Sequence, residues 1–361
     1  MFEHAVIATK GWPLHRGHER LINEARRQSR RVTVLLVWGE GQSPVGEVRA
    51  QWLKDTFPDI KVKLVADIFV DDTNPEDSKL WAVYTKDIMQ GDEFDVVFTS
   101  EPYGPRWAKL MNVECVQVDT RRTIVPISGT AIRQDPYLHW QYINAEARLT
   151  YLKRVLVVGA ESTGKTTLCQ KLANLYSTFY VPEFGRYYVE QFENFEDLTD
   201  LHKRVIFGNI INRQPELERE IEREARLVCF YDTDLFTTAL WYEQWQSARI
   251  GDRLHKTLLH AADLNDSYDL VLISSHESAN WVDDGYRDQT EDIRAQFTER
   301  LLTHFGGRAI LLEGSWDERE ADAIDYINNL FLDSPVTLPV SKFDYISLKE
   351  VSWKASTTKL S

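Results

Sequence analysis

Residues 154–167 constrain the fold of this chain more than any other stretch. An apolar run rich in β-branched residues, 155–158, ends at Gly159, and the spacing Gly-x-x-x-x-Gly-Lys-Thr then leads into a helix-like segment, 167–176. This order of strand, glycine loop and helix is that of a phosphate-binding loop. Its backbone N–H groups and the helix N-terminus form a cradle for phosphate oxygens. The segment therefore predicts an α/β unit that binds a nucleoside triphosphate.

Within this loop, Lys165 is expected to reach the terminal phosphates and to take part in catalysis, and the Thr166 hydroxyl is expected to hold Mg²⁺. The glycines permit positive φ and a close approach of the backbone to the ligand. The candidate phosphate ligands of the loop are Gly159, Ser162, Thr163, Gly164, Lys165, Thr166 and Thr167.

The loop lies near the middle of the chain, so that each half is long enough to form its own core. Both halves alternate short apolar runs with amphipathic stretches, which favours parallel strands joined by crossover helices. We therefore predict an α/β protein of two domains, residues 1–149 with a Rossmann-like fold and residues 150–361 with a P-loop fold. The segment 338–361 has no pattern that places it.

The element boundaries follow from the same alternation. In the first half, strands are predicted at 4–9, 31–38, 60–69, 94–100 and 112–119, and helices at 18–29, 49–57 and 80–90. In the second half, strands are predicted at 154–158, 178–183, 227–232, 268–275 and 308–312, and helices at 197–212, 217–225 and 292–304.

Composition excludes several classes of function. With 42 Lys+Arg against 56 Asp+Glu the net charge is −14, which argues against a nucleic-acid partner because such binding depends on basic side chains. Three widely spaced cysteines, Cys115, Cys169 and Cys229, argue against a disulfide framework or a zinc site. No apolar stretch approaches the ~18 residues of a membrane span. We expect a cytoplasmic enzyme that does not associate with a membrane, and homo-oligomerisation stays open.

A second site is predicted in the first half, where the strand 4–9 runs into the sequence Lys-Gly-Trp-Pro-Leu-His-Arg-Gly-His at residues 10–18. His15 and His18 lie at the start of a helix, at the sheet edge where α/β proteins bind ligands. Two imidazoles there can bind a triphosphate and stabilise the charge of a leaving pyrophosphate. Gly17 lets the backbone approach the ligand, and Lys10 can contact phosphate.

The sequence Ile-Ser-Gly-Thr-Ala-Ile-Arg at residues 127–133 also suggests a ligand-binding helix start. Ser128 and Thr130 offer a cap and N–H donors, and Arg133 can bind a phosphate in a bidentate manner. Alone this motif is weak, because plain helix capping explains it equally well.

Together these motifs resemble the nucleotidylyltransferase superfamily. The stretch Arg-Gln-Asp-Pro-Tyr-Leu-His-Trp at 133–140, followed closely by the phosphate-binding loop, resembles more narrowly the bifunctional nicotinamide-mononucleotide (NMN) adenylyltransferase / ribosylnicotinamide kinase family of NadR-type proteins. Further matching segments are 99–104, 182–186, 232–238 and 281–287. The resemblance covers roughly residues 4 to 315, and the motifs of both domains occur in the family's order.

The resemblance implies two consecutive reactions in NAD salvage, with ATP as co-substrate and Mg²⁺ as cofactor. The C-terminal domain would phosphorylate nicotinamide riboside to NMN, and the N-terminal domain would join NMN to the AMP part of ATP, giving NAD and pyrophosphate. The sequence departs from the family at Trp12, where the first loop usually has Gly-x-Phe, and at 274–280, where the usual Asp is missing. Some members carry an N-terminal DNA-binding helix-turn-helix; this chain begins with strand one, so no repressor role is expected.

The remaining kinase residues are predicted from their positions at strand ends and in loops near the phosphate-binding loop. Asp232, at the end of a predicted strand, is the expected Mg²⁺ partner, with Asp234 as alternate or substrate ligand. Glu183 is expected to orient the acceptor hydroxyl or to take its proton, and Arg186 to bind phosphate or brace Glu183, with a structural Glu–Arg pair as the alternative. Further candidates are Trp12, Trp281 and Asp283 for substrate and Arg287 for phosphate. Asp283, Asp284 and Arg287 lie in a Gly-containing loop that looks like a mobile lid, with a plain solvated loop as the alternative.

Four tryptophans of the first half can stack on a charged nicotinamide ring, although core packing is the more common role of a tryptophan: Trp12, Trp38, Trp81 and Trp107. Two rival functions also stay open. The same motifs fit an adenylyl- or cytidylyltransferase fused to a different small-molecule kinase. Alternatively, the N-terminal domain is a nucleotide sensor beside an active kinase.

Overall fold

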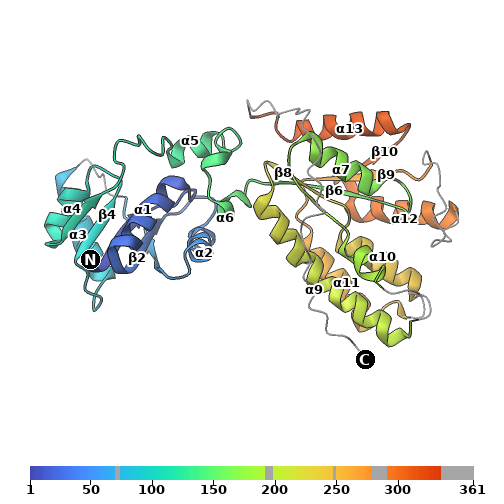
Figure 1. Ribbon diagram of the computed structural model, residues 1–361, viewed down its shortest axis with the longest axis horizontal. Helices are drawn as coiled ribbons and strands as arrows, with labels where there is room; N and C mark the ends of the chain where they lie inside the picture. Colours follow the sequence, from blue (N-terminus) through green and yellow to red (C-terminus); the bar gives the residue numbers. More distant parts are fainter. Residues whose placement is uncertain (70–73, 192–197, 247–248, 278–290, 335–361) are drawn as a thin grey trace. The chain divides into compact units, whose positions relative to one another are not determined.

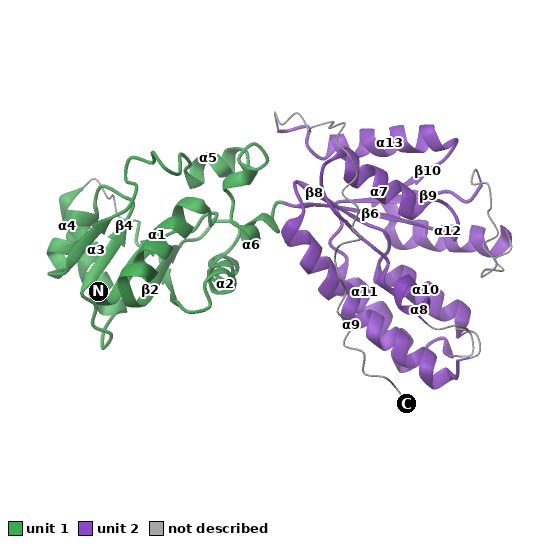
Figure 2. Cartoon of the chain, viewed as in Figure 1, with its two compact units in different colours: residues 1–151 green, residues 152–361 purple. Residues whose placement is uncertain are grey.

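Two parallel five-stranded sheets, one in each half of the chain, form the framework of the computed structural model, which describes residues 1–69, 74–191, 198–246, 249–277 and 291–334. The chain divides into two compact units, residues 1–151 and 152–361 (Figure 2). The division follows Tyr151, close to the boundary predicted after residue 149. The predicted fold class, α/β with a parallel sheet in each half, is confirmed.

In the first unit the strand order is β3-β2-β1-β4-β5, and neighbouring strands run parallel. Strands β2 and β4 of this sheet are labelled in Figure 1. The order reverses between β1 and β4, and such a switch point is where open α/β sheets bind ligands, beyond the carboxyl ends of the strands. The strands are β1 (Phe2–Thr9), β2 (Ser29–Trp38), β3 (Lys61–Ala66), β4 (Val96–Thr99) and β5 (Glu114–Gln117). The helices are α1 (Arg16–Gln28), α2 (Gly46–Thr56), α3 (Pro75–Ile88), α4 (Gly104–Met111), α5 (Gly129–Gln134) and α6 (Ala145–Arg148).

Helices α3 and α4 cover one face of this sheet. Trp81 of α3 and Trp107 of α4 are buried, with ring centroids 6.4 Å apart, and they pack with Val6 and Val97 of the central strands. The Trp107 indole N–H donates to Thr85 Oγ1 over 3.3 Å, so its polar atom is satisfied. Both tryptophans are therefore core residues and not candidates for nicotinamide stacking.

The second unit has the strand order β10-β9-β6-β8-β7, again with parallel neighbours (Figure 1). The strands are β6 (Lys153–Gly159), β7 (Tyr180–Val181), β8 (Val228–Tyr231), β9 (Leu270–Ser274) and β10 (Ala309–Leu312). The helices are α7 (Lys165–Leu175), α8 (Phe184–Val189), α9 (Asp200–Glu224), α10 (Leu235–Trp245), α11 (Arg253–Asn265), α12 (Glu291–Phe305) and α13 (Trp316–Asn329). Over the described residues, no helix is both long enough and apolar enough to cross a bilayer.

Two element predictions for this unit are wrong in detail. The helices predicted at 197–212 and 217–225 are one helix, α9, which continues through Pro215. Buried side chains lie on both sides of the proline, among them Ile210 and Leu217, so that tertiary packing offsets the lost hydrogen bond. The strand predicted at 178–183 is only Tyr180–Val181, which leaves Glu183 beyond the strand end.

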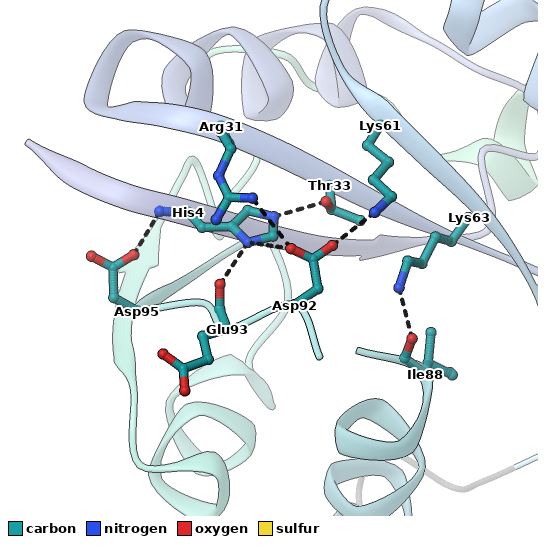
Figure 3. A network of polar contacts seen from close by, with 9 residues as sticks. All are labelled: His4, Arg31, Thr33, Lys61, Lys63, Ile88, Asp92, Glu93 and Asp95. Atoms are coloured by element: carbon teal, nitrogen blue, oxygen red, sulfur yellow. Dashed lines mark hydrogen bonds and ion pairs between the residues drawn. The ribbon is translucent and has the colours of Figure 1, made fainter. Parts of the chain in front are cut away.

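A polar network closes the amino-terminal edge of the first sheet, away from the ligand edge (Figure 3). The buried His4 ring lies 2.8 Å from the Glu93 carbonyl oxygen through Nδ1 and 2.8 Å from Thr33 Oγ1 through Nε2. Because a carbonyl only accepts, Nδ1 donates to Glu93. Asp92 lies 3.5 Å from Nδ1 and also accepts from Lys61. This cluster has a structural role, joining β1 and β2 to the turn before β4.

Replacing His4 by leucine should destabilise the first unit without changing either nucleotide site. The substitution leaves the Thr33 hydroxyl and the Glu93 carbonyl without their partner, and buried unsatisfied groups cost about 1–3 kcal/mol each. We expect the free energy of unfolding of this unit to fall by about 2–4 kcal/mol in urea titrations. The control is Arg30→Ala, which removes an exposed ion pair with Glu3 and should cost less than about 1 kcal/mol. An equal, small effect of both substitutions would contradict this account.

Candidate active sites

The two histidines of the first loop cap helix α1 and stack on each other. His15 is the N-cap residue, and its Nδ1 accepts from the backbone N–H of Gly17 over 3.0 Å. The Nδ1 of His18 accepts from the backbone N–H of His15 over 3.3 Å, and the ring centroids are 3.8 Å apart. A side chain at position 17 would collide with the His15 ring, 2.8 Å from the Cβ it would carry. Gly17 therefore makes room for this ring, a role that the sequence prediction did not include.

This capping geometry determines which nitrogen of each neutral imidazole carries the proton. Each Nδ1 accepts a hydrogen bond, so each neutral ring carries its proton on Nε2 and can donate it to a ligand. Burial, together with the positive charge of Arg122, lowers the pKa of His15 to about 4. Burial, His15 and Arg122 hold the pKa of His18 well below its usual value. Both rings are therefore neutral donors at physiological pH.

The lowered pKa of His15 predicts a pH-dependent stability of the nucleotide-free first unit. Between pH 6.5 and 4 the unfolded chain binds a proton at His15 that the folded chain does not, so stability is complete above pH 6.5 and is lost as the pH falls. The contribution is about 3 kcal/mol. We expect His15→Asn, which keeps a capping side chain, to flatten the urea-stability curve over this range relative to the unsubstituted chain. Parallel curves for the two proteins would contradict the lowered pKa.

Helix α5 brings the second predicted motif onto the first loop. Arg133 donates to the backbone oxygen of Trp12 through Nη1 over 2.6 Å and to Thr130 Oγ1 through Nη2 over 3.1 Å. Its guanidinium also lies 4.0 Å from the centroid of the Trp12 ring. Ser128 caps α5 by accepting from the backbone N–H of Ala131. Segments more than a hundred residues apart thus form one site. The Trp12 ring, a candidate for substrate stacking, makes a cation–π contact with Arg133 in this structure.

Sequence reasoning missed two residues of this site, Arg49 and Asp67. Arg49 is fully buried in α2 and donates to the Lys10 carbonyl over 2.8 Å and to Gln42 Oε1 over 2.8 Å. Asp67, just after β3, accepts from Lys10 Nζ over 2.7 Å and from the Phe69 N–H. Lys10 therefore lies at the loop as predicted, but in this structure it is ion-paired. Only the tertiary fold reveals that Arg49 is buried behind the loop.

The second site lies at the carboxyl end of β6, the central strand of the second sheet. The loop between Gly159 and Gly164 leads directly into α7, and Gly164 has φ +85°. Lys165 Nζ donates to the Ala160 carbonyl over 2.8 Å, and Thr163 Oγ1 donates to the same oxygen over 2.9 Å. The local geometry is that of a formed phosphate cradle. Ser162 belongs to the loop with φ +55°, and Thr167 is exposed in the first turn of α7.

Asp232 faces this loop from the end of β8. Its Oδ2 accepts from Thr166 Oγ1 over 2.6 Å, and the carboxylate is 3 % exposed. Burial is the main cause that raises the pKa of Asp232 to about 7, and the charge of Glu183 acts in the same direction. Its Oδ1 is buried and has no hydrogen-bond partner in the described part of the chain. The predicted pair of Thr166 and Asp232 is thus brought together, with one carboxylate oxygen left for a ligand.

The other predicted residues of this unit take different positions. Glu183 immediately precedes α8 and is close enough to Asp232 to act on its charge. Arg186 donates to Glu190 over 3.2 Å, a helical i,i+4 pair. Asp234 is buried and caps α10 by accepting from the N–H groups of Phe236 and Thr237, so its carboxylate has a structural use. The candidates Trp281, Asp283, Asp284 and Arg287 lie outside the described residues.

The two units define a class: an α/β protein with two candidate nucleotide sites in one chain, a double-histidine loop in the first unit and a P-loop in the second. The model of a family described as "AAA domain" matches residues 154–319. The chain is 27% identical over 329 residues to the "Trifunctional NAD biosynthesis/regulator protein NadR" of Escherichia coli (strain K12), covering 82% of this chain and 74% of that protein. The Salmonella typhimurium protein of the same name gives the same identity and coverage.

Solved structures agree on the fold of the whole chain. A crystal structure of NadR protein in complex with NAD and AMP-PNP superimposes with a TM-score of 0.67 at 20% identity, covering 96% of this chain and 99% of that chain. A crystal structure of NadR protein in complex with NR gives a TM-score of 0.68 at 21% identity, covering 96% and 98%. The chain is thus similar in sequence to NadR proteins over most of its length and shares the fold of the NadR structures, which confirms the resemblance inferred from its motifs.

Proposed function

We propose that this chain is a bifunctional transferase of NAD biosynthesis. Its second unit phosphorylates nicotinamide riboside with ATP to give NMN, and its first unit joins NMN to the adenylyl group of a second ATP, giving NAD and pyrophosphate. The observation that supports the proposal is that the candidate phosphate ligands lie together in each unit, His15 and His18 with Arg133 in the first and the P-loop with Asp232 in the second, in a relative of proteins named for NAD biosynthesis. We further propose that the enzyme works in the cytoplasm on these small molecules.

In the first unit, the proposed reaction needs charge stabilisation and no covalent intermediate. An oxygen of the NMN phosphate attacks the α-phosphorus of ATP; a new P–O bond forms, and the bond to the bridging oxygen breaks, so that the electron pair leaves with pyrophosphate. The Nε2–H groups of His15 and His18 would donate to the triphosphate, since both Nδ1 atoms are occupied by backbone N–H groups. Lys10 and Arg133 would add positive charge, at the cost of loosening their present contacts.

Buried Arg49 supports an anionic ligand at this loop. Its Nε is buried and has no hydrogen-bond partner among the described residues, and its two hydrogen bonds go to neutral oxygens. A guanidinium taken out of water without a carboxylate is costly. Negative charge delivered by a bound phosphate would offset that cost. We therefore include Arg49 among the residues that prepare the first unit for its substrates.

In the second unit, the proposed transfer moves the γ-phosphoryl group. The acceptor hydroxyl oxygen of nicotinamide riboside attacks the γ-phosphorus, the bond to the β-phosphate oxygen breaks, and ADP leaves. Lys165 and the loop N–H groups would stabilise the charge on the phosphates. Glu183, near Asp232, would orient the hydroxyl or accept its proton. Arg186, Trp281, Asp283 and Arg287 stay as proposed contacts to substrate and phosphate.

The residues at the P-loop fit a magnesium ion. Mg²⁺ binds through few protein oxygens and keeps several waters, so two oxygens from the protein are enough for it. The unpartnered Oδ1 of Asp232 and the Thr166 hydroxyl would hold it. When bound, Mg²⁺ neutralises charge at the β- and γ-phosphates.

A time course of product formation tests the proposal. The purified chain is incubated with nicotinamide riboside, excess ATP and Mg²⁺, and the products are separated by chromatography. We expect NMN to appear transiently and NAD to follow it. NMN that accumulates without NAD would assign the first unit a sensing role or another acceptor, and the absence of both products would overturn the proposed substrates.

A further inference from the structure

Arg319, in the first turns of α13, is a buried cation outside the predicted sites. Arg319 is only 3 % exposed. Its Nε donates to the Gly314 carbonyl over 3.1 Å, and its Nη1 donates to the Ser275 carbonyl over 3.0 Å and to Ser274 Oγ over 3.2 Å. These partners are all neutral oxygens. They belong to the carboxyl end of β9 and to the turn between β10 and α13.

No acidic side chain of the described residues forms an ion pair with Arg319. Its Nη2 is buried without a hydrogen-bond partner in the same part of the chain. The carboxylate that acts on it electrostatically is that of Glu313, an exposed residue. Buried guanidinium groups are normally paired with carboxylates or phosphates, because an unpaired buried charge is costly. A local salt bridge therefore does not explain why a positive charge is buried at this position.

Ser274 connects Arg319 to the phosphate-binding loop. Its hydroxyl accepts from Arg319 and donates to the Thr163 carbonyl over 2.7 Å. Its backbone oxygen lies so close to Gly159 that an added Cβ would come within 2.6 Å of it. Arg319 thus orients the Ser274 hydroxyl, and Ser274 touches the loop at both of its ends, near Gly159 and at Thr163.

The same segment reaches the loop at a second point. The ring of Trp316, three residues before Arg319, packs on Gly164, where a Cβ would come within 2.6 Å of ring atom Cζ3. Arg319 holds the turn that carries Trp316 through its bond to the Gly314 carbonyl. The start of α13 therefore supports the loop from Gly159 to Gly164 by two routes, and Arg319 is common to both.

We propose that Arg319 is a positioning residue of the ATP site in the second unit, which holds the phosphate-binding loop through Ser274 and contributes positive charge behind the bound phosphates. This inference rests on the proposed binding of ATP to the P-loop, but not on the identity of the acceptor. Removal of the Arg319 side chain should weaken nucleotide binding by roughly 10- to 100-fold, the range typical for loss of an outer hydrogen-bonding partner of a ligand site.

The test is a calorimetric titration of the full chain with a non-hydrolysable ATP analogue and Mg²⁺, without acceptor. Two binding events are expected, and Lys165→Ala identifies the one at the P-loop. Arg319→Met should weaken that event by the stated factor and leave the other within about twofold. Arg319→Lys, which keeps the charge without the forked geometry, should restore part of the affinity. Arg308→Met, which removes an exposed arginine paired with Asp266, is the control and should change neither event.

Ser274→Ala keeps the test decisive if Arg319→Met does not fold, because it breaks the same connection and changes no charge. It should weaken the P-loop event too, and in phosphorylation assays both variants should raise the KM for ATP more than they lower kcat. Unchanged affinity in Arg319→Met, or in Ser274→Ala, would overturn the proposal. If the titrations give the expected result while nicotinamide riboside is not phosphorylated, the proposed acceptor is wrong and the role of Arg319 stands.

Discussion

Lys165→Ala is expected to lower the phosphorylation of nicotinamide riboside by roughly 100- to 1000-fold, the effect of removing one charge-stabilising donor from a transition state. Lys165 is a half-buried side chain at the start of α7, and in the structure its ammonium group rests on the Ala160 carbonyl inside the loop. Its charge is therefore held inside the loop that we propose binds the terminal phosphates, and no other lysine of the described residues occupies this loop. The measurement is NMN formation from nicotinamide riboside at saturating ATP.

Two control measurements make this expectation specific. Supplied NMN bypasses the kinase, so NAD formation from NMN should stay within about twofold of the unsubstituted enzyme, because the first unit has its own core and its own site. Arg308→Ala, an exposed substitution in the same unit, should leave both activities unchanged. If Lys165→Ala lowered both activities in a folded chain, the two sites would not be independent.

His18→Ala is expected to do the reverse, lowering NAD formation from NMN by roughly 100-fold or more, as expected for a donor to a developing anion. In the proposed mechanism His18 donates its Nε2–H to the triphosphate, and in the structure it supports His15 by ring stacking and by accepting from its backbone N–H. The substitution therefore removes one donor and loosens the second. The measurement is NAD formation from NMN and ATP.

The matched control for this substitution is Arg26→Ala, in the last turn of the same helix, where the side chain forms an exposed ion pair with Asp59. It should leave NAD formation unchanged. NMN formation from nicotinamide riboside should also be unaffected by His18→Ala. A His18→Ala enzyme that still makes NAD at the full rate would remove the histidine pair from the proposed mechanism.

The framework of both units could be predicted from local sequence patterns. Apolar runs rich in β-branched residues mark β1, β2 and β6, whose central residues are buried. The glycine-lysine-threonine spacing marks the start of α7. The patterns failed where tertiary packing overrides a local rule. Pro215 is a helix breaker by propensity, yet α9 continues through it because apolar residues on both sides are buried.

Site residues can be predicted from the sequence where they belong to a motif. They cannot be predicted where burial is their only distinguishing feature. The histidine pair and the pair of Thr166 and Asp232 follow from spacing and strand ends. Arg49 and Arg319 are single arginines within amphipathic helices, and nothing in the sequence shows that their guanidinium groups are buried behind nucleotide loops. Their signal is that, in the described part of the chain, their hydrogen bonds go to neutral oxygens and not to a carboxylate, which is visible only in three dimensions.

The most direct test of the central claim, two consecutive reactions in one chain, uses ATP that carries distinguishable phosphorus labels in its α- and γ-phosphates. The chain is incubated with this ATP, Mg²⁺ and nicotinamide riboside, and the NAD formed is isolated. One phosphate of NAD should come from the γ-position through the kinase and the other from the α-position through adenylyl transfer, so the account predicts both labels in equal amounts. NAD with the α-label alone, or γ-labelled NMN that never becomes NAD, would contradict it.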